Sequence, residues 1–182
     1  MVTTAEIERV RRDARQVYSA AEVEAALTAM AERITADLAS SHPLVVAVMH
    51  GGVFAAVHLC ERFGFPYEFD YLHVGRYGRG VEGGDLTWIV RPTRAFKDRV
   101  VLLVDDVLDR GITLAALHAE LRGIGVAELR TAVLVSKEID DPDSRPPVDY
   151  VGLRAGPGYL FGCGMDYKGY WRHMPGLFAV PA

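Results

Sequence analysis

The sequence predicts an α/β fold in which a twisted parallel sheet is flanked by helices. Three stretches, at residues 44–49, 100–104 and 132–135, are apolar without a break. Unbroken apolar runs of this length are typical of strands buried on both faces of a parallel sheet. The first two runs are each followed by a glycine-bearing turn and then by apolar residues at helical spacing. Strands that lead into helices in this way indicate an α/β architecture.

Length and composition predict one soluble globular domain over residues 1–182, because half of the residues are hydrophobic and 24% are charged. The formal charge of −4 gives no basic surface for nucleic acid, so no nucleic-acid partner is expected. The charged N-terminus and the lack of a long apolar run predict neither a signal peptide nor a membrane partner. Cys60 and Cys163 are expected to be buried apolar residues in a reducing, cytoplasmic location.

The N-terminal part of the chain predicts two helices. Residues 4–16 indicate a short charged helix with no evident function. Ser19 and Glu22 then form a capping-box pattern, in which hydroxyl and carboxylate bind backbone N–H groups at the start of a helix. The helix that follows carries an apolar stripe made of Val23, Leu27, Met30, Ile34 and Leu38. This second helix is therefore expected to cover a core.

The turn after the strand at 44–49 reads His50-Gly51-Gly52 and leads into a helix through residues 54–59. A Gly-Gly turn at a helix start presents backbone N–H groups to an anion. His-Gly-Gly also occurs in the oxyanion loop of lipases. The chain contains no Gly-x-Ser-x-Gly nucleophile motif, however, so a lipase is excluded. The turn predicts an anion site.

A glycine-rich segment at 75–85 lies between predicted strands at 68–74 and 86–90. Gly78, Gly80 and Gly83 match the G-x-G-x-x-G pattern of dinucleotide-binding proteins, but that fingerprint requires a helix afterwards. Because a strand follows instead, the match is accidental. The segment is either a mobile lid over a site or an ordinary hairpin tip.

The most informative stretch follows the strand at 100–104. Asp105 and Asp106 come where that strand ends, and Asp109, Gly111 and Thr113 follow before the next helix begins. Ligands of α/β sheets bind at the carboxyl ends of strands, and a helix N-terminus favours a phosphate. A phosphorylated sugar meets both requirements, with hydroxyls for the acids and a phosphate for residues 110–113. The alternative is a capped turn with solvated acids.

Two further features follow in the last third of the chain. Lys137 ends the apolar strand at 131–138 and is either a solvated strand end or a group at the same rim as the acids. The segment at 158–172 is rich in glycine and aromatic residues and carries one acid and one arginine, Asp166 and Arg172. Each of these residues, taken alone, is equally compatible with a place in the core or on the surface.

The stretch at 100–114 resembles the phosphoribosyl pyrophosphate motif of type I phosphoribosyltransferases: an apolar run, two acids, two apolar residues, Asp, a variable residue, Gly and Thr. The segment at 158–172 resembles the ending of the purine enzymes among them. Over about residues 17–180 the chain thus resembles the bacterial hypoxanthine-guanine phosphoribosyltransferases. This resemblance implies the type I phosphoribosyltransferase fold, with a flexible glycine-rich lid loop, a helical extension at 1–16 and a small hood from about 17–40 and 150–182.

The resemblance also implies a reaction. The enzyme would transfer the 5-phosphoribosyl group of phosphoribosyl pyrophosphate to a 6-oxopurine, hypoxanthine or guanine, giving IMP or GMP and pyrophosphate. Mg²⁺ would be the cofactor, and the assembly would be a homodimer or homotetramer. Two alternatives stay open. One is an enzyme of the same type that prefers xanthine or a non-purine acceptor, and the other is a nucleic-acid-binding regulator with this fold.

Residue roles for the sugar and the phosphates follow from the same resemblance. Asp109 would act as the general base toward purine N7. Asp105 and Asp106 would hold the ribose hydroxyls. The 5′-phosphate would be wrapped by Arg110, Gly111, Ile112 and Thr113, and pyrophosphate would be bound by His50, Gly51 and Arg172. The family often has threonine at 110 and lysine at 50 and 112.

The remaining roles concern the purine, the metal and the lid. Lys137 would donate to the purine 6-oxo group, Tyr159 would stack on the base, and the Leu160 backbone would read its edge. Asp166 would ligate magnesium together with Asp105 and Asp106. The lid would begin at Arg76, Tyr77 and Gly78, where the family often has Ser-Tyr-Gly. The bond between Met49 and His50 is the candidate for the cis peptide found in this family.

Overall fold

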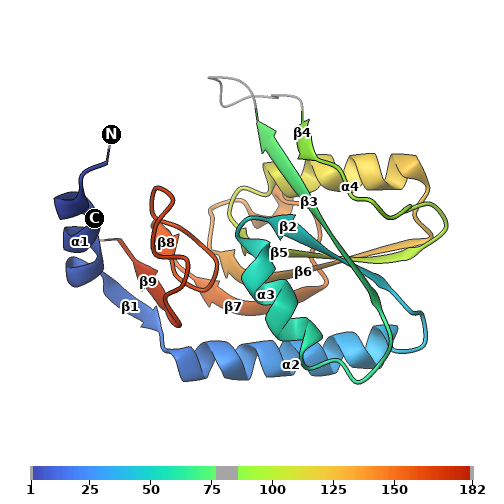
Figure 1. The fold of residues 1–182 in the computed structure, drawn as a ribbon, viewed down its shortest axis with the longest axis horizontal. Coiled ribbons are helices and arrows are strands. Elements are labelled where there is room, and N and C mark those ends of the chain that lie inside the picture. Colours follow the sequence, from blue (N-terminus) through green and yellow to red (C-terminus); the bar gives the residue numbers. More distant parts are fainter. Residues whose placement is uncertain (1, 77–85, 181–182) are drawn as a thin grey trace.

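A computed structural model describes residues 2–76 and 86–180, and its central feature is a six-stranded sheet (Figure 1). The strand order is β4-β3-β2-β5-β6-β7, and every neighbouring pair is parallel except β3 and β4. The strands are β2 (Leu44–Met49), β3 (Glu68–Arg76), β4 (Leu86–Val90), β5 (Val100–Leu108), β6 (Glu128–Lys137) and β7 (Tyr150–Ala155). The predicted parallel sheet is confirmed, with one antiparallel strand at its edge.

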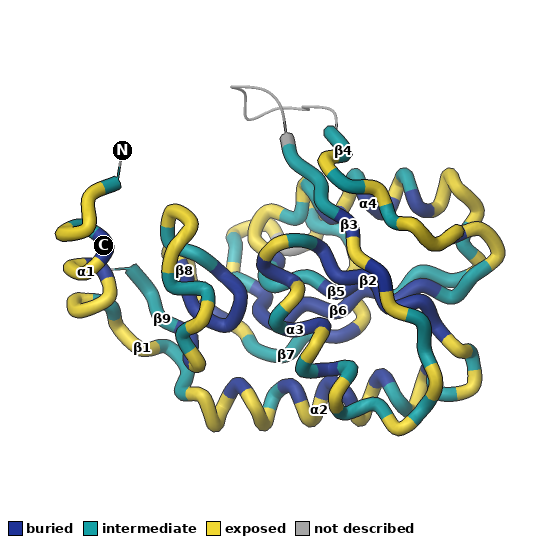
Figure 2. Tube along the Cα trace, in the orientation of Figure 1, coloured by how far each residue is buried: buried dark blue, intermediate teal, exposed yellow. Residues whose placement is uncertain are grey.

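Helices cover both faces of this sheet. The helices α2 (Ala20–Leu38) and α3 (Gly52–Cys60) pack on one face, and α4 (Ile112–Ile124) packs on the other (Figure 1). Alternate residues of β2 serve the two faces, since Val45 packs with α2 and α3 whereas Val46 packs with α4. Burial on both sides explains the unbroken apolar runs. Figure 2 shows the buried residues gathered along β2, β5 and β6.

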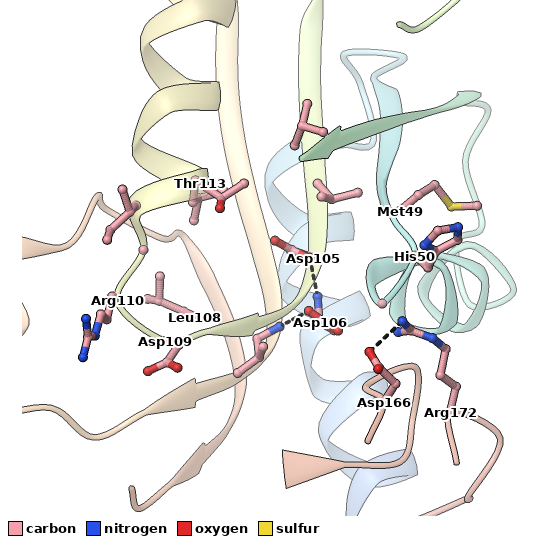
Figure 3. Close-up of a pocket in the computed structure, with 17 residues that line it drawn as sticks. Met49, His50, Asp105, Asp106, Leu108, Asp109, Arg110, Thr113, Asp166 and Arg172 are labelled. Carbon is pink, nitrogen blue, oxygen red and sulfur yellow. Dashed lines mark hydrogen bonds and ion pairs between the residues drawn. The ribbon is translucent and has the colours of Figure 1, made fainter. Parts of the chain in front are cut away.

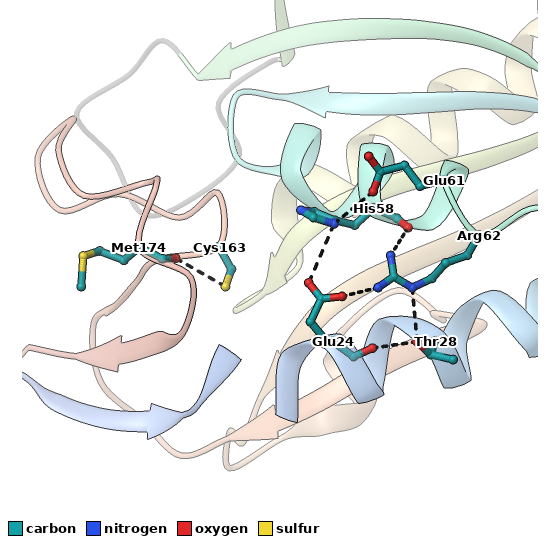
Figure 4. Close-up of polar contacts among 7 residues, drawn as sticks. All are labelled: Glu24, Thr28, His58, Glu61, Arg62, Cys163 and Met174. Atoms are coloured by element: carbon teal, nitrogen blue, oxygen red, sulfur yellow. Dashed lines mark hydrogen bonds and ion pairs between the residues drawn. The ribbon is translucent and has the colours of Figure 1, made fainter. Parts of the chain in front are cut away.

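Arg62, just beyond α3, ties that helix to α2 (Figure 4). Its guanidinium pairs with Glu24, donates to the Thr28 hydroxyl at 3.2 Å and donates to the His58 carbonyl at 2.6 Å. The His58 ring lies 3.4 Å from the Glu61 carboxylate. These contacts fix α3 and, with it, the turn at its N-terminus.

A smaller antiparallel sheet is built from both ends of the chain. Its order is β1-β9-β8, with β1 at Arg15–Tyr18, β8 at Leu160–Phe161 and β9 at Leu177–Ala179. Helix α1 (Thr4–Asp13) lies beside it, at the left of Figure 1. A 3₁₀ turn at Pro142–Ser144 follows β6. The small sheet lies next to the carboxyl ends of the parallel strands.

Several boundaries expected from the sequence differ in the structure; the strand expected to end at residue 104, for example, continues as β5 through Asp105 and Asp106 to Leu108. The helix expected at 4–16 ends at Asp13, because the backbone becomes extended at Ala14 (φ −66°, ψ 141°) and enters β1. The expected hood included 17–40, but α2 packs on the main sheet, where Leu27 and Ile34 are fully buried. The strand β7 likewise belongs to the main sheet. The part outside that sheet is the small sheet with α1.

Both cysteines are free, and Cys163 is buried while Cys60 is partly buried. The Cys163 thiol faces the Met174 carbonyl at 3.6 Å (Figure 4). Burial raises the pKa of Cys163 to about 12 and that of Cys60 to about 11. Both thiols therefore stay protonated and unreactive at neutral pH.

In the described part of the chain, every helix is too short or too polar to cross a membrane. Of the expected lid residues, Arg76 is the last residue of β3, and Tyr77 and Gly78 lie outside the described residues.

Candidate active site

A cavity of about 490 Å³ opens at the carboxyl ends of β2 and β5 (Figure 3). It is lined by residues 48–51, by residues 105–114 and by Asp166 and Arg172 from the loop after β8. A second cavity, of about 190 Å³, shares Asp106, Asp109 and Asp166 with it and adds Lys137 and Tyr159. Segments distant in the sequence thus form one site at the edge of the sheet where ligands of such folds bind.

Asp105 and Asp106 are two adjacent carboxylates at the base of the larger cavity. Their side chains open to the cavity but are otherwise enclosed by protein atoms. The Asp106 N–H donates to the Asp105 Oδ1 at 2.9 Å, and the Val107 N–H donates to the Asp106 Oδ1 at 2.7 Å. Burial, and then the charge of Asp106, raises the pKa of Asp105 well above its usual range. Burial also raises the pKa of Asp106, and the charge of Arg172 opposes that rise.

Asp105→Asn is expected to raise the melting temperature of the ligand-free chain at pH 8. A raised pKa in the folded state favours the neutral acid. The neutral Asp105 carboxyl therefore contributes fully to the free energy of unfolding below its pKa in the unfolded chain, near 3.9. This contribution is lost as pH rises through its pKa in the folded chain. Asparagine keeps the Oδ1 acceptor without the buried charge. Each kcal/mol released should raise the melting temperature by about 2–4 °C.

Thermal unfolding in EDTA at pH 5 and pH 8 measures this effect, and the gain should be larger at pH 8. Asp98→Asn, at an exposed position far from the cavity, is the matched control. A lower melting temperature for Asp105→Asn at pH 8 would contradict the expected cost of burying this charge.

The turn after β2 approaches Asp106 so closely that only glycine fits. A Cβ at Gly51 would lie 1.6 Å from the Asp106 Oδ2, and one at Gly52 would lie 2.5 Å from the Val104 carbonyl. The Met49–His50 peptide, the candidate named from the sequence, is cis. The His50 ring meets the His73 ring edge-on, with centroids 4.4 Å apart. Burial, with the nearby His50, lowers the pKa of His73.

The N-terminus of α4 faces the same cavity. Gly111 precedes the helix in the left-handed conformation, with φ 71°, which glycine adopts without strain. Among the described residues, no side chain caps this end of α4, so its first backbone N–H groups stay open to the cavity. Thr113 lies in the first turn, and the Arg110 side chain points away from Asp105 and Asp106 (Figure 3). This end of the helix has the chemistry of a phosphate site.

The second cavity brings together the groups expected to contact the base. Lys137 Nζ lies 3.2 Å from the Asp109 Oδ2, and the lysine side chain is only 13% exposed. A solvated strand end is therefore ruled out for Lys137. Tyr159 is half exposed and meets Tyr167 edge-on, with ring centroids 5.8 Å apart, while Leu160 is buried in β8.

Asp166 and Arg172 form an ion pair in the wall of the larger cavity (Figure 3). The Arg172 Nη2 lies 2.6 Å from the Asp166 Oδ1, and the Nη1 donates to the Gly164 carbonyl at 2.6 Å. Within the described ranges, no three acids, histidines or cysteines converge on one point as a ready metal cage.

Arg145 supports residues of the site through their backbone, a role that the sequence did not reveal. Its Nη1 lies within hydrogen-bonding distance of three backbone carbonyls, those of Lys137 at 2.7 Å, Asp109 at 3.3 Å and Leu108 at 3.4 Å. One guanidinium thus ties the end of β5 to the end of β6. Arg145 lies in a polar, proline-bearing loop, and nothing in the sequence of that loop distinguishes this arginine from a surface residue.

Sequence comparison finds relatives that cover most of the chain. Hypoxanthine-guanine-xanthine phosphoribosyltransferase of Tritrichomonas foetus is 27% identical over 161 residues, covering 88% of each chain. Hypoxanthine-guanine phosphoribosyltransferase of Aquifex aeolicus is 29% identical over 160 residues, covering 83% of this chain and 85% of the relative.

Solved structures share the fold. A hypoxanthine phosphoribosyltransferase from Staphylococcus aureus superposes with a TM-score of 0.86 at 19% identity, covering 100% of this chain and 97% of the other. A hypoxanthine-guanine-xanthine phosphoribosyltransferase gives a TM-score of 0.84 at 24% identity, covering 92% of this chain and 97% of the other. The sequence profile of the phosphoribosyl transferase domain matches residues 13–160. The chain therefore belongs to the phosphoribosyl transferase domain family.

Proposed function

We infer that this chain is a purine-salvage phosphoribosyltransferase, which joins a 6-oxopurine, hypoxanthine or guanine, to phosphoribosyl pyrophosphate and releases IMP or GMP and pyrophosphate. One observation carries the inference. The acids Asp105 and Asp106, the open N-terminus of α4 and the Lys137–Asp109 pair share one pair of joined cavities. The names of the relatives reported above include hypoxanthine, guanine or xanthine, which supports this class of acceptor.

The larger cavity suits the phosphorylated sugar. Asp105 and Asp106 would accept hydrogen bonds from the ribose hydroxyls. Backbone N–H groups of residues 110–113 and the Thr113 hydroxyl would hold the 5′-phosphate at the start of α4. His50, Gly51 and Arg172, on the opposite wall, would hold pyrophosphate as it leaves. The sugar is thereby gripped at both ends, so the C1 atom is exposed to a base that enters beside Asp109.

The smaller cavity suits the purine. Tyr159 would stack on the base, which contributes about 1–3 kcal/mol, and the Leu160 backbone would read its edge. Lys137 would donate to the 6-oxo group. The amino group of adenine is itself a donor, so it would leave the lysine unpaired, and such mismatches discriminate strongly. The Asp109 carboxylate would accept the proton from N7 as N9 of the purine bonds to C1 and the bond from C1 to pyrophosphate breaks.

Asp105, Asp106 and Asp166 line the larger cavity, and each would be available as a carboxylate ligand to a Mg²⁺ ion that also binds the phosphates of the substrate. Adjacent buried acids with raised pKa values need a cation or hydroxyl donors to be ionised together. Mg²⁺ is commonly bound by one or two carboxylates plus substrate phosphates, so a complete protein cage is not required. When bound, the ion would neutralise charge on the departing pyrophosphate. Arg172 would share that task and keep Asp166 oriented.

Xanthine preference is the second candidate for the acceptor, because the name of the Tritrichomonas foetus relative includes xanthine. Nucleotide formation from phosphoribosyl pyrophosphate and Mg²⁺ with guanine, hypoxanthine, xanthine, adenine or uracil tests both candidates. We expect turnover of 6-oxopurines and none of adenine or uracil. Xanthine turnover well above that of guanine would favour the second candidate. No turnover with any base would refute the enzyme assignment and favour a regulator.

A homodimer or homotetramer stays a prediction. Phe69 and Tyr71 on β3 and Ile89 on β4 are exposed apolar side chains, between 40% and 55% accessible. Such a patch supports an interface on this side of the sheet. Sedimentation velocity of the purified chain would measure the assembly.

A further inference from the structure

Helix α1 docks on the loop that carries Asp166 and Arg172, although the two segments are about 160 positions apart in the chain. The Glu6 Oε1 accepts from the Tyr167 hydroxyl at 2.9 Å and from the Lys168 Nζ at 2.7 Å. The Trp171 indole donates to the Ile7 carbonyl at 3.1 Å, and the Arg11 guanidinium lies over the Trp171 ring at 5.4 Å. The Ile7 side chain is buried as well, so apolar packing accompanies these polar contacts.

The loop itself is a tight turn held in an unusual conformation. Tyr167 and Tyr170 exchange two backbone hydrogen bonds of 2.9 Å. Lys168 and Trp171 adopt left-handed conformations, with φ of 50° and 68°, which side-chain-bearing residues rarely occupy. Such conformations persist only where surrounding contacts impose them. Helix α1 supplies contacts to both of these residues.

The contacts of α1 fall between the two site residues. Tyr167 and Lys168 follow Asp166 directly, and Trp171 directly precedes Arg172. Asp166 and Arg172 in turn line the larger cavity and pair with each other. The helix also lies largely outside residues 13–160, the part that matches the family.

We propose that α1 is a positioning element of the active site, with Glu6 as the positioning residue that sets the geometry of the Asp166–Arg172 pair. The ligand of this pair would be magnesium pyrophosphate or the pyrophosphate end of the sugar substrate. This choice of ligand rests on the function proposed above. Glu6 touches neither ligand. It fixes Tyr167 and Lys168, and their backbone fixes the carboxylate and the guanidinium on either side.

The test compares Glu6→Gln with Glu8→Gln, an identical change at an exposed position of the same helix. Calorimetric titration of each chain with magnesium pyrophosphate should show about tenfold weaker binding for Glu6→Gln and none of this loss for Glu8→Gln. In steady-state kinetics the KM for phosphoribosyl pyrophosphate should rise by a similar factor, with the KM for the purine unchanged. The double variant with Glu6→Gln and Lys168→Met should bind magnesium pyrophosphate no more weakly than the weaker-binding single variant, because both substitutions remove the same contact between Glu6 and Lys168.

Hydrogen exchange gives a readout that needs no ligand. The amides of Gly164, Tyr167 and Tyr170 bond within the loop and should exchange faster in Glu6→Gln than in Glu8→Gln. Unchanged exchange, or a KM for the purine that rises as much as that for the sugar substrate, would overturn the proposal. Failure of the wild-type chain to form any nucleotide would instead refute the proposed function, and the exchange comparison would still decide the role of α1.

Discussion

Asp109→Asn is expected to lower kcat for nucleotide formation by about 10²- to 10⁴-fold, the range for loss of a general base. Asparagine keeps the shape of the side chain but cannot accept the N7 proton. The Asp109 carboxylate is 57% exposed and lies at the junction of the two cavities, where base and sugar would meet. The rate with saturating hypoxanthine and phosphoribosyl pyrophosphate measures the effect.

Asp98→Asn is the matched control, because Asp98 is exposed and its left-handed conformation, with φ 59°, suits asparagine. It should leave kcat unchanged. The KM for phosphoribosyl pyrophosphate should also stay near the wild-type value in Asp109→Asn, since this carboxylate contributes to the chemical step. A loss of less than tenfold in kcat would rule out Asp109 as the general base.

The main sheet and its catalytic edge could be predicted from the sequence because their signals are local. A strand buried on both faces reads as an unbroken apolar run, as in β2 and β5. The acids at 105 and 106 and the turn at 50–52 follow such runs directly, so their place at the edge was implied by the fold. Parallel strands then bring these segments together.

Features that depend on long-range packing could not be predicted in this way. The apolar stripe of α2 shows that the helix covers a core but not which core, and only the folded chain shows that it packs on the main sheet. Arg145 and Glu6 act through contacts whose partners are set only by the folded backbone. The strands β8 and β9 contain two and three residues, which is too short for a periodic pattern to appear.

Gly51→Ala is expected to reduce kcat/KM for phosphoribosyl pyrophosphate by about 10²-fold or more. The added methyl group would lie 1.6 Å from the Asp106 Oδ2, well inside van der Waals contact. Either the carboxylate or the turn at 50–52 must therefore move by about 1 Å, and a displacement of that size typically costs about 10²-fold in rate. Overpacking of this kind also destabilises folding by about 1–3 kcal/mol. Steady-state kinetics and thermal unfolding measure the two effects.

Gly64→Ala is the matched control, because a Cβ there would meet nothing within 4 Å, and it should leave both quantities unchanged. A second comparison separates the clash from a general loss of loop geometry. In Gly51→Ala combined with Asp106→Ala the opposing carboxylate is gone, so the melting temperature should exceed the value expected from adding the single effects. Activity should stay low, because the ribose would lose a carboxylate. Wild-type activity in Gly51→Ala would mean that the turn and the acid are not in close contact.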